Sequence, residues 1–114
     1  MSNVTPFVLP ARAAAQVVFD RAELNAILNI YGRLVAAGEW RDYAIAMDRD
    51  AAVFSCFRRA SERPEAQVVK RPALRNKQGM FALIGEGGAV LKRGHELSSV
   101  LAPLERRLMK LVEA

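Results

Sequence analysis

The spacing of apolar residues changes twice along this chain of 114 residues, and this change restricts the fold more than any other feature. Between Leu24 and Val35 the apolar residues recur every three or four positions, which predicts an amphipathic helix. Between positions 43 and 92 short β-prone runs alternate with turn residues, which predicts four or five strands. Helical spacing returns at Leu97, Leu101, Leu104, Leu108 and Leu111. This order predicts an α+β fold with a four- or five-stranded antiparallel sheet, flanked by an N-terminal and a C-terminal helix.

The first helix carries clear start and stop signals. Asp20 is a good N-cap, and Glu23 three residues later completes the pattern of a capping box. Gly38 supplies the left-handed residue at which helices commonly end. Gly32 lies inside the helix, where glycine costs up to about 1 kcal/mol relative to alanine. We expect close packing against the sheet to explain it.

The last helix contains Pro103, which the interior of a helix tolerates poorly. We therefore expect a firm helix from about Pro103 onward, with residues 96–102 as a less regular lead-in. Its leucines form a short seam of heptad-like spacing. Such a seam either packs inside the monomer or forms a homodimer through the C-terminal helix, and the sequence leaves both interpretations open.

The chain is long enough for one domain. Residues 1–15 contain two prolines and little periodicity, so we interpret them as a flexible N-terminal arm, followed by a single α+β domain over 16–114. No run approaches the roughly 20 apolar residues of a membrane span, so no membrane partner is expected. The start of the chain lacks the pattern of a signal peptide, and Cys56 is the only cysteine. We therefore expect a cytoplasmic protein.

The positive charge is concentrated in residues 58–93, where nine Lys and Arg stand against three Glu, a balance of +6 within a total of +5. Paired cations follow the predicted strands, and a surface of this kind suits an anionic partner, either nucleic acid or an acidic protein. The alternative is a solvated rim whose cations protect the edges of the sheet. Whether the cations gather at one rim or spread over two is not decided by the sequence. The candidate binding residues are Arg58, Arg59, Lys70, Arg71, Arg75, Lys77, Lys92, Arg93 and His95.

Other side chains give no pattern for catalysis. His95 is the only histidine and lacks companions at metal-ligand spacing, so no metal is expected. Cys56 lies in a β-prone run, where a free cysteine is usually a packing residue. No catalytic residue and no cofactor is therefore predicted, and a binding module is favoured over an enzyme. The alternative is a small protein-interaction or homodimerising domain with a basic, solvated rim.

Several phrases of the sequence resemble a family of short alphaproteobacterial proteins, a domain of unknown function. The most specific phrases are Gly38-Glu39-Trp40-Arg41-Asp42-Tyr43 and Lys92-Arg93-Gly94-His95-Glu96-Leu97, and further similar stretches lie between residues 17 and 97. The family has no established activity. The resemblance therefore implies a cytoplasmic domain and assigns no catalytic residue.

Overall fold

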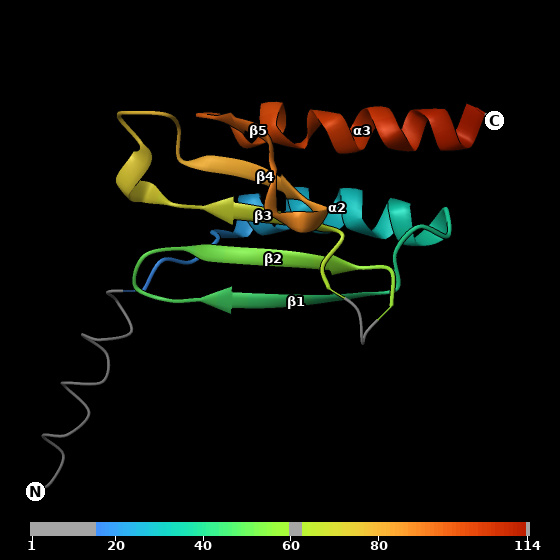
Figure 1. Ribbon diagram of the computed structural model, residues 1–114, viewed down its shortest axis with the longest axis horizontal. Helices are drawn as coiled ribbons and strands as arrows, with labels where there is room; N and C mark the ends of the chain where they lie inside the picture. Colours follow the sequence, from blue (N-terminus) through green and yellow to red (C-terminus); the bar gives the residue numbers. More distant parts are fainter. Residues whose placement is uncertain (1–15, 60–62, 114) are drawn as a thin grey trace, which may run out of the picture.

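The computed structural model describes residues 16–59 and 63–113, which form an antiparallel sheet with two helices on one face (Figure 1). The N-terminal arm that the sequence predicts lies outside the described residues. The strands are β1 (Asp42–Met47), β2 (Ala52–Phe57), β3 (Ala66–Lys70), β4 (Phe81–Gly85) and β5 (Val90–Gly94), and they follow one another in space as they do in the chain. The α+β prediction is confirmed, with five strands.

Helix α2 (Arg21–Ala36) begins as predicted. The Asp20 carboxylate accepts from the backbone N–H of Glu23 at 2.8 Å, and the Glu23 carboxylate accepts from the N–H of Asp20 at 2.9 Å. Together they satisfy two of the backbone donors that a helix start leaves without partners. After the cap at Ala37, Gly38 adopts φ +85° and turns the chain toward β1.

Helix α3 (Leu97–Glu113) starts earlier than predicted, because residues 97–102 are already helical and Pro103 lies inside the helix. Proline removes one backbone hydrogen bond, to the carbonyl of Ser99. Ser99 is exposed, so water can solvate that carbonyl. The same turn buries Val100 and Leu101, and this burial outweighs the lost bond.

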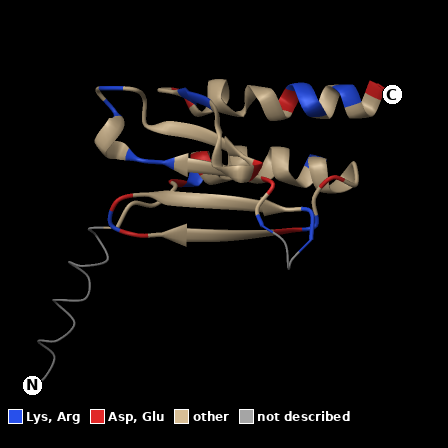
Figure 2. Cartoon of the chain, in the orientation of Figure 1, with Lys and Arg blue, Asp and Glu red and all other residues tan. Residues whose placement is uncertain are grey.

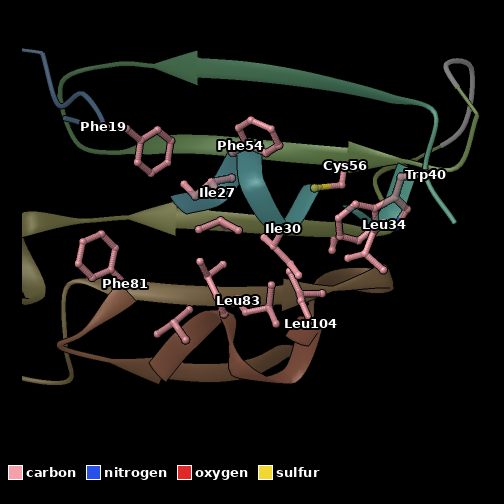
Figure 3. Packing of buried hydrophobic residues seen from close by; sticks show 14 of the residues in the cluster. Phe19, Ile27, Ile30, Leu34, Trp40, Phe54, Cys56, Phe81, Leu83 and Leu104 are labelled. Carbon is pink, nitrogen blue, oxygen red and sulfur yellow. The ribbon is translucent and has the colours of Figure 1, made fainter. Parts of the chain in front are cut away.

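The core lies between the sheet and both helices (Figure 3). Ile27, Ile30 and Leu34 project from α2 onto Phe54 of β2 and Leu83 of β4. From α3 the buried residues are Val100, Leu101, Leu104 and Leu108. Three leucines of the predicted seam are thus buried within the monomer, whereas Leu111 is 36% exposed.

The opposite face of the sheet is covered by neither helix. The register aligns Ala44, Ser55, Gln67 and Ile84 in one row across β1 to β4, and Phe57 of β2 shares their face. The described side chains of this face are mostly small or uncharged, and the Gln67 amide donates to the Ser55 hydroxyl at 3.0 Å. Phe54 and Phe57 of β2 point to opposite faces of the sheet, and α3 lies on the side of Phe54.

One local expectation needs correction. Gly32 is exposed, and a Cβ built on it would meet no atom within 4 Å, so close packing does not explain this glycine. The segment from Gln16 to Phe19 leads into α2 without forming a strand. Its Val17 N–H donates to the Asp48 carbonyl at 2.8 Å, which connects the approach to α2 with the β1–β2 turn.

Candidate anion-binding site

The candidate cations lie at both ends of the sheet, not at one rim (Figure 2). Arg58 and Arg59 follow β2, at the end where β3 begins. Lys70 and Arg71 follow the antiparallel β3 and therefore lie at the opposite end. The register brings that end of β3 beside the start of β4 and the end of β5, since Lys70 pairs with Phe81 and Phe81 pairs with Gly94.

The β3–β4 loop and the end of β5 are in close contact. Gly79 adopts φ +114°, and a Cβ built on it would lie 2.5 Å from the Gly94 carbonyl carbon. Only glycine fits this approach. The loop is itself ordered by the short 3-10 helix Pro72–Leu74 and by a bond of 2.7 Å from the Arg71 N–H to the Met80 carbonyl. Six candidate residues thereby share one end of the molecule, which we call the basic end: Arg71, Arg75, Lys77, Lys92, Arg93 and His95.

The side chains of the basic end face solvent. All are exposed except that of Arg93, which is half-buried, and within the described ranges none makes a hydrogen bond or an ion pair. Their charges are therefore not neutralised by direct contacts with described acidic side chains. The charge of Arg71 acts on the acidic β1–β2 turn. The pKa of Asp48 is lowered by hydrogen bonds from the N–H groups of Asp50 and Ala51, and further by the charge of Arg71.

Lys70 has a structural role instead. Its ammonium group donates to the Glu23 carboxylate at 2.7 Å and to the Val18 carbonyl at 2.8 Å, and its side chain is only 14% exposed. The reason is strand alternation, because Lys70 shares the helix-facing side of β3 with Ala66 and Val68. Lys70 therefore joins β3 to the start of α2.

Arg58 belongs to an ion-pair cluster at the other end of the sheet. Its guanidinium donates to Oε2 of Glu65 at 2.7 Å and lies 3.7 Å from Glu39. Oε1 of Glu65 accepts from the Trp40 indole N–H at 2.6 Å and from Arg107 at 3.0 Å. Arg107 also donates to Glu39 and lies 5.9 Å from the Trp40 ring centre. We call these five residues the Glu65 cluster; it links the exit of α2, the β2–β3 connection and α3.

Sequence reasoning missed the Glu65 cluster. Burial raises the pKa of Glu65, but hydrogen bonds from Arg58 and Trp40 and the charge of Arg107 bring it below its usual value. Conversely, burial lowers the pKa of Arg107, and its bonds to Glu39 and Glu65 raise it overall. In the sequence, Trp40 after Gly38 and Glu39 was a signal for this region, but it did not identify Glu65 and Arg107 as the partners.

Cys56 is a packing residue, as the sequence indicated. Its side chain is 1% exposed, and burial, with a smaller effect of the Glu65 charge, raises the pKa of the thiol to about 12. A thiol of this kind is a poor nucleophile at neutral pH.

The described ranges contain no group of three or more His, Cys, Asp or Glu side chains that could hold a metal ion. The exposed Lys and Arg side chains of the basic end offer positive charge and hydrogen-bond donors.

These features define a class of protein: an α+β domain with a five-stranded antiparallel meander and two helices on one face. A model of the family "Protein of unknown function (DUF2794)" matches residues 17–101, and the chain belongs to this family. Searches of curated proteins and of solved structures found no match. Neither helix in the described ranges has the length and apolar character needed to cross a bilayer.

Proposed function

We propose that this domain is a non-enzymatic binding module that contacts the phosphates of a nucleic acid through its basic end. The observation that carries the proposal is the contact between the β3–β4 loop and the end of β5 at Gly79 and Gly94. This contact brings together two basic stretches that lie about twenty positions apart in the sequence. Five Lys and Arg side chains project there without ion pairs to described residues.

The chemistry of these side chains fits the phosphate backbone better than base edges. Lys and Arg on loops and strand ends reach phosphates without a fixed geometry, which gives affinity but little sequence preference. Arg93 lies on the uncovered face of the sheet, since it pairs with Ala82 of β4. Phosphates that bind at the end of the sheet would thus place the attached nucleotides next to this mostly uncharged face. The lone cysteine and the absence of a membrane-spanning helix among the described residues support a cytoplasmic setting.

The test is fluorescence polarisation of labelled single-stranded and double-stranded oligonucleotides, from low to physiological salt. The site variant combines Arg71→Ala, Arg75→Ala, Lys77→Ala and Arg93→Ala. We expect it to bind much more weakly. Its plot of log K against log salt concentration should also be flatter, with the slope reduced by roughly 0.9 for each duplex phosphate contact that is lost.

A matched control removes four positive charges elsewhere, with Arg21→Ala, Arg41→Ala, Arg106→Ala and Lys110→Ala, all exposed positions. This variant should keep most of the affinity of the wild type. Equal losses in both variants would mean that only net charge matters. No binding at low salt would reject the nucleic-acid module.

The second candidate is a small protein-interaction domain that uses the free ends of the helices. A groove of about 290 Å³ lies between α2 and α3, lined by Arg33, Ala36, Ala37, Leu108 and Val112. Val112 of this lining is 65% exposed, and Met109 on the same helix is 49% exposed. This apolar surface favours a helical or extended peptide partner. Binding to such a partner would depend little on salt, in contrast to phosphate contacts.

A further inference from the structure

Within the described residues, the first strand of the sheet is an edge that no further strand covers. Strand β1 pairs there with β2 alone, with a regular register, and residues 42–47 contain no Lys, Arg or Pro. The other edge, β5, carries Lys92 and Arg93, an irregular register with β4, and a neighbouring helix. Proteins use such charges and irregularities to prevent the pairing of edges. Strand β5 has both features, whereas the charge within β1 is limited to Asp42 at its start.

The backbone groups of alternate β1 residues point away from the sheet. The Asp48 N–H donates to the Ala51 carbonyl at 3.0 Å, so Asp48 and Ala51 form a hydrogen-bonded pair. Because such pairs alternate along an antiparallel ladder, Tyr43, Ile45 and Met47 direct their N–H and C=O groups outward. The Tyr43 N–H agrees with this, since it donates to the side chain of Asp42 at 2.8 Å instead of to β2.

Beyond Asp42 at its start, the side chains of β1 make the edge apolar on both faces. Tyr43 and Ile45, which lie on the helix-covered side opposite Cys56 and Phe54, are 45% and 38% exposed. On the other face Ala44 and Ala46 are exposed and small. A strand added at this edge would cover Tyr43 and Ile45 and meet no bulky side chain on the alanine face.

We propose that β1 pairs with β1 of a second copy of this chain, antiparallel about a two-fold axis at Ala44. This register uses the outward N–H and C=O groups of Tyr43 and Ile45, and it sets each Tyr43 opposite Ile45 of the second copy. Aromatic and β-branched side chains form favourable cross-strand pairs. Ala44 of each copy lies at the centre, where small side chains allow close approach.

Charge favours the register with the axis at Ala44 over the register with the axis at Ile45. An axis at Ile45 would set Asp42 of each copy opposite Asp48 of the other, which is unfavourable. The axis at Ala44 instead sets Asp42 opposite Ala46 and brings Arg41 near the acidic turn of Asp48 and Asp50. The result is a continuous ten-stranded sheet. Strands of six residues bury little area, so we expect a weak, reversible dimer.

The first test is sedimentation velocity of the full chain over a wide range of concentrations. The wild type should shift from monomer to dimer as concentration rises. Ile45→Lys places a charge on the edge and should stay monomeric, whereas Val90→Lys, the same kind of change on the exposed β5, should dimerise like the wild type. Circular dichroism should show that both variants are folded.

The second test determines the register directly, by crosslinking through an introduced cysteine. Residues opposite each other in a non-hydrogen-bonded pair have Cα atoms about 4.5 Å apart, within the range of a disulfide. Ala44→Cys should therefore give a covalent dimer under mild oxidation. Ala46→Cys is the control, because its two copies would lie about 13 Å apart. Cys56 is buried and should not interfere.

Three results would overturn the proposal. The first is a wild type that stays monomeric at every concentration, which would leave another partner for this edge. The second is a dimer that Ile45→Lys does not weaken. The third is equal crosslinking by Ala44→Cys and Ala46→Cys. None of these results depends on whether the basic end binds nucleic acid.

Discussion

The indole N–H of Trp40 donates a 2.6 Å hydrogen bond to Oε1 of Glu65, 25 residues away in the sequence. This bond connects the exit of α2 to the start of β3. The Trp40 side chain is 1% exposed, so its N–H has no access to bulk water and needs this partner. The same Glu65 oxygen accepts from Arg107, which attaches α3 to the same point.

Trp40→Phe should lower the free energy of unfolding by about 2 kcal/mol, because it removes a hydrogen bond to a charged group and some buried volume. Urea denaturation followed by circular dichroism measures the change. Tyr43→Phe is the control: the ring of Tyr43 is 45% exposed, and its hydroxyl makes no hydrogen bond to a described residue, so the expected change is below about 0.5 kcal/mol. Equal effects of the two variants would contradict a stabilising role for the Trp40–Glu65 bond.

Acidification should destabilise the protein through Glu65. Its pKa is lowered in the folded state, so the carboxylate contributes stability at pH values above its unfolded pKa. That contribution is lost as pH falls through the folded pKa. Glu65→Gln should be less stable than the wild type at neutral pH, with a difference that shrinks as pH falls below the usual pKa of a Glu side chain, about 4.3. Urea midpoints across this range test it, and a constant difference would exclude the titration of Glu65 as the cause.

The secondary structure followed from local signals, whereas the contacts between elements did not. The capping box of Asp20 and Glu23 lies within four residues, so the sequence shows it directly. The partners of Trp40 lie 25 and 67 positions away, and only the folded sheet brings them together. For the same reason the sequence did not separate Arg58, held by Glu65, from the exposed Arg71. Pro103 misled the prediction because burial of Val100 and Leu101 outweighs a local propensity.

Cys56 should resist thiol reagents in the folded protein, because its thiol is buried and its pKa is raised to about 12. Reaction with a disulfide reagent at neutral pH should proceed only as fast as the protein opens. In denaturing urea, the reaction of Cys56 with the reagent should be fast. Ser98→Cys introduces an exposed thiol on α3 and should react at once in native protein, while Cys56 in the same chain stays unmodified. Rapid labelling of Cys56 in the native wild type would contradict the buried position.

Replacing Gly32 or Gly79 with alanine should change the stability of the protein in opposite directions. Gly32 lies in a helix, and a Cβ there would meet nothing within 4 Å, so Gly32→Ala should stabilise the protein by up to about 1 kcal/mol. Gly79 has φ +114° and its Cβ would collide with the backbone of Gly94, so Gly79→Ala should destabilise the protein and separate the β3–β4 loop from β5.

Thermal unfolding gives the sign of both changes. Oligonucleotide binding by the same two variants then tests whether the contact at Gly79 assembles the basic end. Gly79→Ala should bind more weakly at temperatures where it remains folded, since the loop would no longer hold Arg75 and Lys77 beside Arg93. Gly32→Ala should bind like the wild type. Unchanged binding by folded Gly79→Ala would mean that the loop and β5 contribute to binding without their close contact.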